Sequence, residues 1–264
     1  MKKYLVVGNP IEHSLSPKLH NYWIANQGIK AIYDKKKIEK NELRDLVSDI
    51  KKKKISGANV TVPFKKLIIP FLDKLTEEAS KTQSVNTIYL NNEEIIGHNT
   101  DIDGFENAMK KINFDFNRKK IFIVGAGGVV SSIVFALKKM NVSNIMITNR
   151  TKAKAVDLKS LFNNLEIIEW GTIPEFDVII NATSVGLKKN DKLNLDLSNI
   201  GKNKLFYDVI YNPPETNFLE TGKKLGNKYE NGKLMFIYQA VTAFNLWHGT
   251  NLIPNIETFK LLDE

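Results

Sequence analysis

The sequence predicts an α/β protein of two domains, and three observations support this prediction. Short apolar runs rich in β-branched residues alternate with segments of helical period along most of the chain. The length of 264 residues falls where a single hydrophobic core stops growing, at about 250–300 residues. A glycine-bearing strand–helix unit begins near the middle of the chain, so we expect a domain boundary near residues 101–119.

The first half of the chain contains a mixture of short strands and helices. We expect strands at 4–7, 31–35 and 55–60, helices at 17–27 and 41–53, and a β-hairpin formed by 85–90 and 94–97. The helix at 41–53 places Leu43, Leu46, Val47 and Ile50 on one face. This pattern predicts that the first half forms an α/β domain of its own.

In the second half of the chain, predicted strands and helices alternate more regularly. We expect helices at 103–112, 129–140, 152–162, 236–247 and 256–262, and strands at 121–124, 144–148, 178–180 and 205–209. Strands separated by helices are typical of parallel sheets, because a parallel connection needs a crossover segment. We therefore expect parallel sheets, with a cleft between the two domains.

Composition excludes several functional classes. The absence of Cys excludes a disulfide scaffold, a thiolate nucleophile and a cysteine-ligated zinc site. No apolar run approaches the ~20 residues that span a bilayer, and the first apolar stretch is too short for a secretion signal. The four histidines show no ligand spacing, so we expect no metal. These observations predict a cytoplasmic protein without a membrane partner.

The net charge of +9 raises the question of a nucleic-acid partner. Of the 38 basic residues, only Arg44, Arg118 and Arg150 are arginine, the side chain best suited to bidentate phosphate and base contacts. The lysines are scattered, and the run 51–54 is expected to close a helix, whose C-terminus favours positive charge. We therefore expect a solvated lysine surface and no nucleic-acid partner.

A glycine-rich motif follows the strand at 121–124 and opens a helix. Its residues are Gly125, Ala126, Gly127, Gly128, Val129 and Val130. In a Rossmann-like nucleotide-binding unit the first glycine permits the tight turn, and the second lets the backbone approach a pyrophosphate at the helix N-terminus. Val130 stands where Gly or Ala is usual, so we expect looser or rearranged helix–strand packing there. A plain strand–helix turn remains the alternative.

The next strand ends in Asn149 and Arg150, just over twenty residues after the first glycine. NAD-binding units usually carry an acidic residue at this point, whereas an arginine suits the 2′-phosphate of NADP. Lys152 and Lys154 follow and add positive charge. NADP is therefore preferred over NAD, with a helix cap beside ordinary surface charges as the alternative.

Polar residues also follow the strands of the first domain. Ser14 and Ser16 could hold a carboxylate, although Ser16 and Pro17 would equally serve as a helix N-cap and first helical residue. Further polar segments lie at 59–65, 85–87 and 99–101, and another, 181–186, ends a strand in the second domain. Ligands of open α/β sheets bind at such strand ends, so the first-domain groups are expected to converge on one polyhydroxylated ligand.

Taken together, these segments resemble the shikimate dehydrogenase family over nearly the whole chain. The resemblance is carried by 8–10, 13–17, 20–21, 59–65, 85–88, 99–104, 125–128, 149–151, 181–186 and 208–213, and by Thr216, Leu219, Gly232, Met235, Gln239, Phe244 and Trp247. Many spaced motifs in family order are far more specific than one glycine loop.

The resemblance implies a reversible, NADP(H)-dependent reduction of 3-dehydroshikimate to shikimate, on the route to chorismate and aromatic amino acids. It assigns Lys65 and Asp101 as catalytic residues. It assigns substrate binding to Ser14, Ser16, Thr61, Asn86, Asp101, Tyr211 and Gln239. It assigns cofactor binding to Gly125, Ala126, Gly127, Gly128, Val129, Asn149, Arg150, Thr151, Lys154, Thr183, Val209, Gly232 and Met235.

The resemblance also implies that the C-terminal helices return to the first domain. We therefore expect a substrate-binding domain of residues 1–101 and 236–264 and an NADP-binding domain of residues 102–235, in a monomer or homodimer. Ser84 and Lys154 depart from the family pattern. An NAD- or quinate-using relative and a non-catalytic NADP-binding sensor remain alternatives.

The sequence leaves the role of Lys65 open. It could transfer the proton to and from the substrate oxygen as a general acid and base. A neighbouring carboxylate such as Asp101 favours the charged ammonium, so Lys65 could instead act by polarising that oxygen and orienting the ring.

Overall fold

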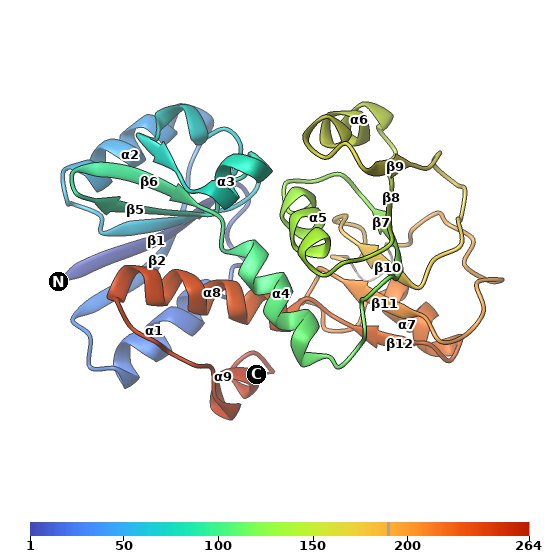
Figure 1. Cartoon of the computed structure of the whole chain (residues 1–264). Helices are drawn as coiled ribbons and strands as arrows, with labels where there is room; N and C mark the ends of the chain where they lie inside the picture. Colours follow the sequence, from blue (N-terminus) through green and yellow to red (C-terminus); the bar gives the residue numbers. More distant parts are fainter. Residues whose placement is uncertain (189–190, 264) are drawn as a thin grey trace. The chain divides into compact units, whose positions relative to one another are not determined.

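The computed structural model describes residues 1–188 and 191–263, and the chain divides into two compact units (Figure 1). Unit 1 comprises Met1–Gly104 and Ile237–Glu264, and unit 2 comprises Phe105–Phe236. Each unit has its own sheet with helices packed on it, so the predicted α/β class is confirmed. Within the described residues, no helix is long and apolar enough to cross a membrane.

Unit 1 contains a mixed sheet. Its strands are β1 (Lys2–Gly8), β2 (Ala31–Lys37), β3 (Gly57–Val60), β4 (Lys74–Leu75), β5 (Thr87–Asn91) and β6 (Glu94–His98), in the order β2-β1-β3-β5-β6-β4. Strand β1 is parallel to β2 and β3, whereas β5 is antiparallel to both β3 and β6. The prediction of parallel sheets is therefore wrong only for part of this half: the predicted hairpin is confirmed as β5–β6, and it enters the sheet antiparallel to β3.

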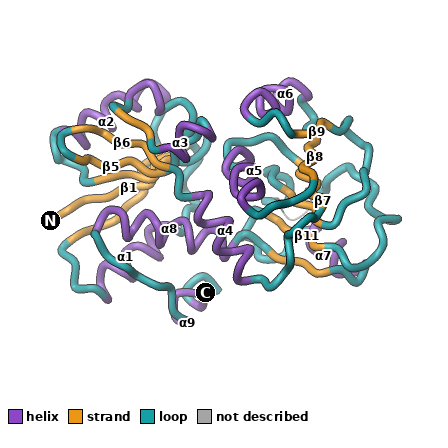
Figure 2. Tube along the Cα trace, in the orientation of Figure 1, coloured by secondary structure: helices purple, strands orange, loops and turns teal. Residues whose placement is uncertain are grey.

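Helices cover both faces of this sheet (Figure 2). The helices of unit 1 are α1 (Ser16–Asn26), α2 (Leu43–Lys51), α3 (Glu77–Thr82), α9 (Ile256–Lys260) and, from Ile237 on, α8 (Lys233–His248), with 3₁₀ turns η1 (Lys40–Glu42) and η2 (Ile69–Phe71). Helix α4 (Asp101–Lys111) begins in unit 1 and continues into unit 2 from Phe105. Helices α2 and α3 lie on one face, and α1 and α8 lie on the other. The apolar face expected for 41–53 is buried, although the α-helix begins at Leu43, after the 3₁₀ turn.

The C-terminal part of α8 is built into unit 1. The ring of Trp247 stacks on Tyr4 at 4.9 Å, and its Nε1 donates a hydrogen bond to the carbonyl of Ile88 at 3.2 Å. A side chain at Gly57 would lie 2.5 Å from the same Nε1, so glycine is needed for this approach. Unit 1 is thus completed by residues from the end of the chain.

Unit 2 contains a parallel sheet with doubly wound order. Its strands are β7 (Lys120–Val124), β8 (Asn144–Thr148), β9 (Leu165–Ile167), β10 (Val178–Asn181), β11 (Leu205–Asp208) and β12 (Lys228–Glu230), in the order β12-β11-β10-β7-β8-β9. Numbered from β7, this is the Rossmann order, in which ligands bind where the order reverses, between β7 and β10. The helices are α5 (Val130–Lys139), α6 (Lys152–Leu161) and α7 (Asn217–Lys224). The Rossmann-like prediction is confirmed.

Candidate active site

Lys65 and Asp101 form an ion pair in unit 1. Lys65 lies in the loop after β3 and Asp101 is the first residue of α4, and the Nζ–Oδ2 distance is 2.5 Å. The side chains are only 12% and 8% exposed. The Lys65 carbonyl accepts a hydrogen bond from the backbone of Val85 at 2.9 Å, which fixes the loop. Two buried charges are tolerable here because each neutralises the other.

Asn86 connects this pair to its surroundings. Its Nδ2 donates to Asp101 Oδ1 at 2.9 Å and lies 3.5 Å from Gln239 Oε1 on α8. Its Oδ1 accepts from the backbone N–H of Thr100 at 2.8 Å and from Thr87 Oγ1 at 3.1 Å. Four of the residues assigned by the resemblance, Lys65, Asn86, Asp101 and Gln239, are therefore neighbours in unit 1.

Ser14 and Ser16 lie at the start of α1. The helix begins at Ser16 and its N-cap is Leu15, so the alternative that Ser16 is the N-cap is wrong. The Ser14 Oγ instead accepts a hydrogen bond from the Ser16 backbone at 3.3 Å. Ser16 itself is buried. Two hydroxyls therefore lie at a helix N-terminus, where the helix dipole favours an anion.

Thr61 is placed by the loop after β1. Its backbone N–H donates a hydrogen bond to the carbonyl of Val7 at 2.9 Å, and the N–H of Asn9 donates to the carbonyl of Val62 at 3.1 Å. A side chain at Gly8 would lie 2.5 Å from the Thr61 methyl group, so glycine is required where these two loops meet. The motifs 8–10 and 59–65 are thus adjacent.

In unit 2 the glycine motif forms the turn between β7 and α5. Gly125 has a φ of +113°, and a side chain there would lie 2.8 Å from the carbonyl of Ala182 at the end of β10. The loop therefore lies at the switch point, where the strand order reverses between β7 and β10, with Gly127 and Gly128 exposed. Val130 is fully buried as the first residue of α5, so the larger side chain is accommodated in the core.

Asn149 ties this loop to the end of β8. Its Oδ1 accepts from the backbone of Ala126 at 3.1 Å, and its Nδ2 donates to the carbonyl of Thr151 at 2.8 Å. Sequence reasoning did not foresee this function of the Asn149 amide. It holds the next two candidates, Arg150 and Thr151, beside the glycine turn.

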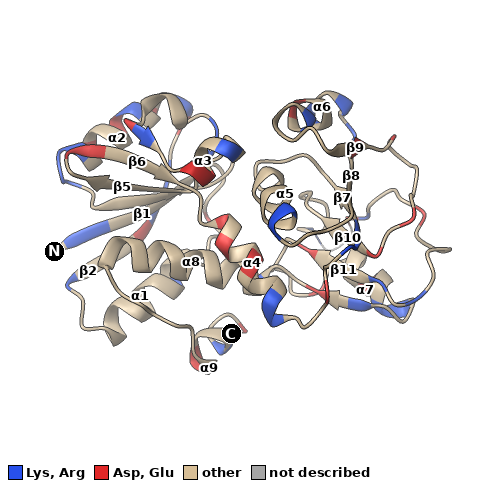
Figure 3. Ribbon diagram, in the orientation of Figure 1, with Lys and Arg blue, Asp and Glu red and all other residues tan. Residues whose placement is uncertain are grey.

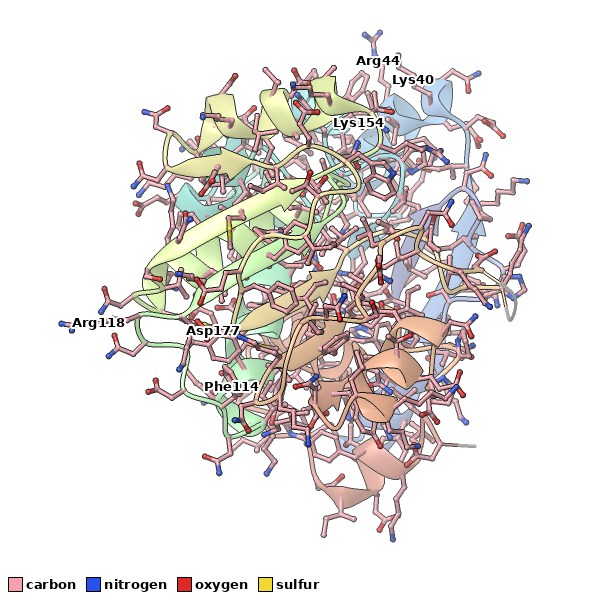
Figure 4. All side chains as sticks on the ribbon, turned by 90° about the vertical axis from the view of Figure 1, so that its right-hand side faces the viewer. Lys40, Arg44, Phe114, Arg118, Lys154 and Asp177 are labelled. Atoms are coloured by element: carbon pink, nitrogen blue, oxygen red, sulfur yellow. The ribbon has the colours of Figure 1, made fainter. Side chains whose placement is uncertain are left out.

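Three cations follow β8, and they differ in their partners. Lys152 pairs with Glu169, whereas Arg150 and Lys154 are exposed and pair with no carboxylate among the described residues. Lys154 lies on α6, away from Arg118, which precedes β7 at the opposite end of the strands (Figure 4). Arg150 and Lys154 therefore supply the positive charge at the edge that carries the glycine loop.

A buried polar network links the ends of β10 and β11. Asn181 accepts from Thr183 Oγ1 at 2.7 Å and donates to both oxygens of Asp208 at 3.1 Å, and Thr216 Oγ1 donates to Asp208 at 2.6 Å. Burial raises the pKa of Asp208 to about 6, and the hydrogen bonds oppose that rise. Asn181 and Asp208 were not among the predicted site residues, although both end apolar strands, and they position Thr183.

The remaining unit 2 candidates lie together beyond β11. A side chain at Gly232 would lie 2.1 Å from the carbonyl of Val209, so these two backbones are in direct contact. Met235 is buried one residue before Phe236, whose ring stacks on Tyr211 at 4.3 Å. The structure thus brings together Val209, Gly232, Met235 and Tyr211.

Comparison with known proteins identifies the family. A model of the shikimate dehydrogenase substrate binding domain matches residues 6–88, and a shikimate / quinate 5-dehydrogenase model matches residues 106–209. The shikimate dehydrogenase (NADP(+)) of Pelagibacter ubique is 56% identical over 264 residues, 99% of each chain. The crystal structure of shikimate dehydrogenase from Aquifex aeolicus has a TM-score of 0.89 and 35% identity, covering 100% of this chain and 96% of that one.

A second solved structure contains ligands. Shikimate 5-dehydrogenase from Thermus thermophilus, in complex with NADP(H) and shikimate, has a TM-score of 0.90 and 28% identity, and the match covers 100% of this chain and 99% of that one. The similarity to both the sequences and the structures therefore extends over the two units. The chain belongs to the shikimate dehydrogenase family.

Proposed function

We propose that the chain is an NADP-dependent shikimate dehydrogenase, which reversibly reduces 3-dehydroshikimate to shikimate on the route to chorismate and aromatic amino acids. The observation that carries this proposal is the buried Lys65–Asp101 pair, bonded to Asn86 at the strand ends of unit 1. The family membership and the names of the relatives support it.

The reaction needs a hydride and a proton. NADP(H), when bound, supplies or accepts the hydride. Lys65 and Asp101 hold the proton at the oxygen that is a ketone in one direction and a hydroxyl in the other. The ammonium of Lys65 polarises the ketone oxygen as negative charge develops on it, and low exposure strengthens that effect.

The substrate is oriented by groups distributed around its ring. Ser14 and Ser16 bind the carboxylate at the start of α1, where the helix N-terminus adds favourable charge. Thr61, Asn86, Asp101 and Gln239 bind the ring hydroxyls, and Tyr211 contributes from unit 2. This separation between carboxylate and hydroxyl anchors fixes which carbon is presented for reaction.

The side chains and backbone of unit 2 fit NADP. Exposed Gly127 and Gly128 precede a ten-residue helix at the switch point, a backbone arrangement suited to a pyrophosphate. Arg150 and Lys154 suit the 2′-phosphate, with Asn149 and Thr151 beside them. The remaining cofactor-binding residues are Gly125, Ala126, Val129, Thr183, Val209, Gly232 and Met235.

We further propose that unit 1 is the substrate-binding domain and unit 2 the NADP-binding domain of a cytoplasmic monomer or homodimer without a nucleic-acid partner. Three lysines of the 51–54 run pair with Asp73, Glu93 and Asp49, which supports a solvated surface. Figure 3 likewise shows basic residues spread over several helices and strands, among acidic ones.

One assay tests the function. Absorbance of the reduced nicotinamide is followed with shikimate or quinate, each against NADP⁺ and NAD⁺. We expect the highest kcat/KM for shikimate with NADP⁺. A higher value for quinate or for NAD⁺ would identify a relative of different specificity, and absence of turnover in all four combinations would indicate a non-catalytic NADP-binding protein.

A further inference from the structure

Tyr33 is a buried residue of β2 that none of the assigned roles uses. The residue is 2% exposed, and its hydroxyl donates to Asn59 Oδ1 at 2.6 Å. Burial raises the pKa of Tyr33 well above its ordinary value, opposed by a hydrogen bond with the Ser16 side chain. The Tyr33 hydroxyl is therefore a buried donor held by the Asn59 side chain.

Asn59 continues the connection toward the ion pair. Because its Oδ1 accepts from Tyr33, its Nδ2 must point the other way, and it donates to the carbonyl of Asn86 at 3.1 Å and to Thr87 Oγ1 at 3.0 Å. The Thr87 hydroxyl then donates to Asn86 Oδ1. This sets the orientation of the Asn86 amide, whose Nδ2 faces Asp101 Oδ1.

We propose that Tyr33 is a positioning residue, which orients the Lys65–Asp101 pair through Asn59 and Asn86. This inference rests on the proposed function. The unit 1 relay is the hydrogen-bonded series Tyr33, Asn59, Thr87, Asn86, Asp101 and Lys65. Each amide in it has only one orientation that satisfies both of its neighbours.

Tyr33 is held firmly enough for this role. Asn21 on α1 donates to the Tyr33 carbonyl at 2.7 Å and accepts from its N–H at 2.9 Å. The ring of His20 stacks on the Tyr33 ring at 4.0 Å with an angle of 4°. Helix α1 therefore positions Tyr33, the residue at which the relay begins.

The relay ends on groups that also bind the substrate. The Nδ2 of Asn86 donates to Asp101 Oδ1, and both residues are proposed to bind ring hydroxyls. A change in the orientation of the Asn86 amide should therefore affect both shikimate binding and the chemical step.

Tyr33→Phe tests the proposal, because it removes only the hydroxyl and keeps the ring on His20. We expect kcat with shikimate to fall about 5-fold and the shikimate Kd to rise about 5-fold, the scale of one hydrogen bond. The Kd for NADP⁺ should not change. Tyr4→Phe, which removes a hydroxyl from buried Tyr4 on the neighbouring strand outside the relay, should match the wild type in both values.

A second comparison separates positioning from general loosening of the fold. If Tyr33 acts through Lys65, then Tyr33→Phe should lower kcat no further in a Lys65→Met background. Equal 5-fold losses in both backgrounds, or wild-type kcat and Kd in Tyr33→Phe, would overturn the relay. A wild-type enzyme that neither binds nor oxidises shikimate would overturn the proposed function, and the relay with it. The two failures are distinguishable, because the function is tested on the wild type and the relay on the variants.

Discussion

The two units present their candidate residues in opposite ways. In unit 1 the groups are buried side chains that bind one another, as Lys65, Asp101 and Asn86 do. In unit 2 they are mainly backbone at a glycine turn and exposed cations such as Arg150. A buried network gives a unique geometry, because every partner must be satisfied. A backbone turn with surface charge instead gives adaptable recognition of a common phosphate group.

This difference predicts where substitutions act. Changes in the buried network of unit 1 should affect the chemical step, because they alter charge and orientation next to the reacting oxygen. Changes at the edge of unit 2 should affect cofactor affinity, because each group contributes one contact to a distant part of NADP.

Lys65→Met gives the largest expected effect and tests the first half of this contrast. The change keeps the length of the side chain but removes its charge and proton, so kcat should fall by about 10²–10⁴. KM for shikimate should change little, because the carboxylate and hydroxyl anchors remain. Steady-state kinetics in both directions measure the two parameters.

Lys66→Met is the matched control, since Lys66 is the adjacent lysine and is exposed. It should retain wild-type kcat. A Lys65→Met enzyme with near-normal kcat and a strongly raised KM would make Lys65 a binding residue, and the contrast between the units would disappear.

Arg150→Ala tests the prediction for unit 2, that changes there affect cofactor affinity. Loss of hydrogen bonds to a charged phosphate should weaken NADP⁺ binding by about 1.5–3 kcal/mol, while NAD⁺ binding stays nearly constant. Titration of both cofactors against the variant measures this. Lys159→Ala, in the last turn of α6, the helix that follows Arg150, serves as the control for removing one positive charge. Equal losses for NADP⁺ and NAD⁺ would place the 2′-phosphate elsewhere.

His20 provides a pH test of the buried character of unit 1. Both ring nitrogens are buried without a hydrogen-bond partner, and burial, with a smaller contribution from His248, lowers the pKa of His20 to about 3. A pKa lower in the folded than in the unfolded state gives stability that is complete above about pH 6.5 and is lost as the pH falls toward 3. Between pH 7 and pH 5 this loss should reach about 2 kcal/mol.

His20→Phe removes the titrating group and keeps a ring against Tyr33. Between pH 7 and pH 5 the free energy of unfolding of the wild type should therefore fall by about 2 kcal/mol more than that of His20→Phe. Urea denaturation at the two pH values measures this difference. His13→Asn, at an exposed histidine, should follow the wild type. Parallel curves for the wild type and His20→Phe would show that His20 is not the acid-sensitive group.

Asn149→Ala gives the smallest expected effect. Removing the Oδ1 that accepts from Ala126 loosens the glycine turn, so NADP⁺ and NAD⁺ should both bind about 5-fold more weakly, as for one neutral hydrogen bond. An equal loss of affinity for both cofactors distinguishes a residue that holds the glycine turn from one that binds the 2′-phosphate. A selective loss for NADP⁺ would assign Asn149 to the phosphate as well.

Much of the fold could be predicted because long strands and helices carry a clear period. The strand at 144–148 and the helix start at 152 agree with β8 and α6. The missed strands β4, β9 and β12 have two or three residues each, too few for any alternation to be recognised. Helices α3 and α7 were also missed, although Thr76 and Thr216 cap them with side-chain hydrogen bonds. A search for capping residues would have found both.

The site could be predicted in part. Motif order along the chain named Lys65, Asp101 and Asn86, and the structure brings them into contact. Tyr33 was not named, because a tyrosine in an apolar strand gives no sign that its hydroxyl is buried against Asn59. Such partners depend on which strands are neighbours in the sheet, and sequence spacing alone does not determine this.

The packing of Trp247 on Tyr4 has a consequence for how the protein is made. The first 104 residues emerge from the ribosome long before the end of α8 is synthesised. During that time the face of unit 1 around Tyr4 and Trp23 is not covered by α8. Unit 2, which is continuous in sequence, can fold during this interval. A premature stop after residue 236 would therefore leave the nucleotide-binding half intact in sequence and deprive the other half of Phe244 and Trp247, the last aromatic side chains of its core.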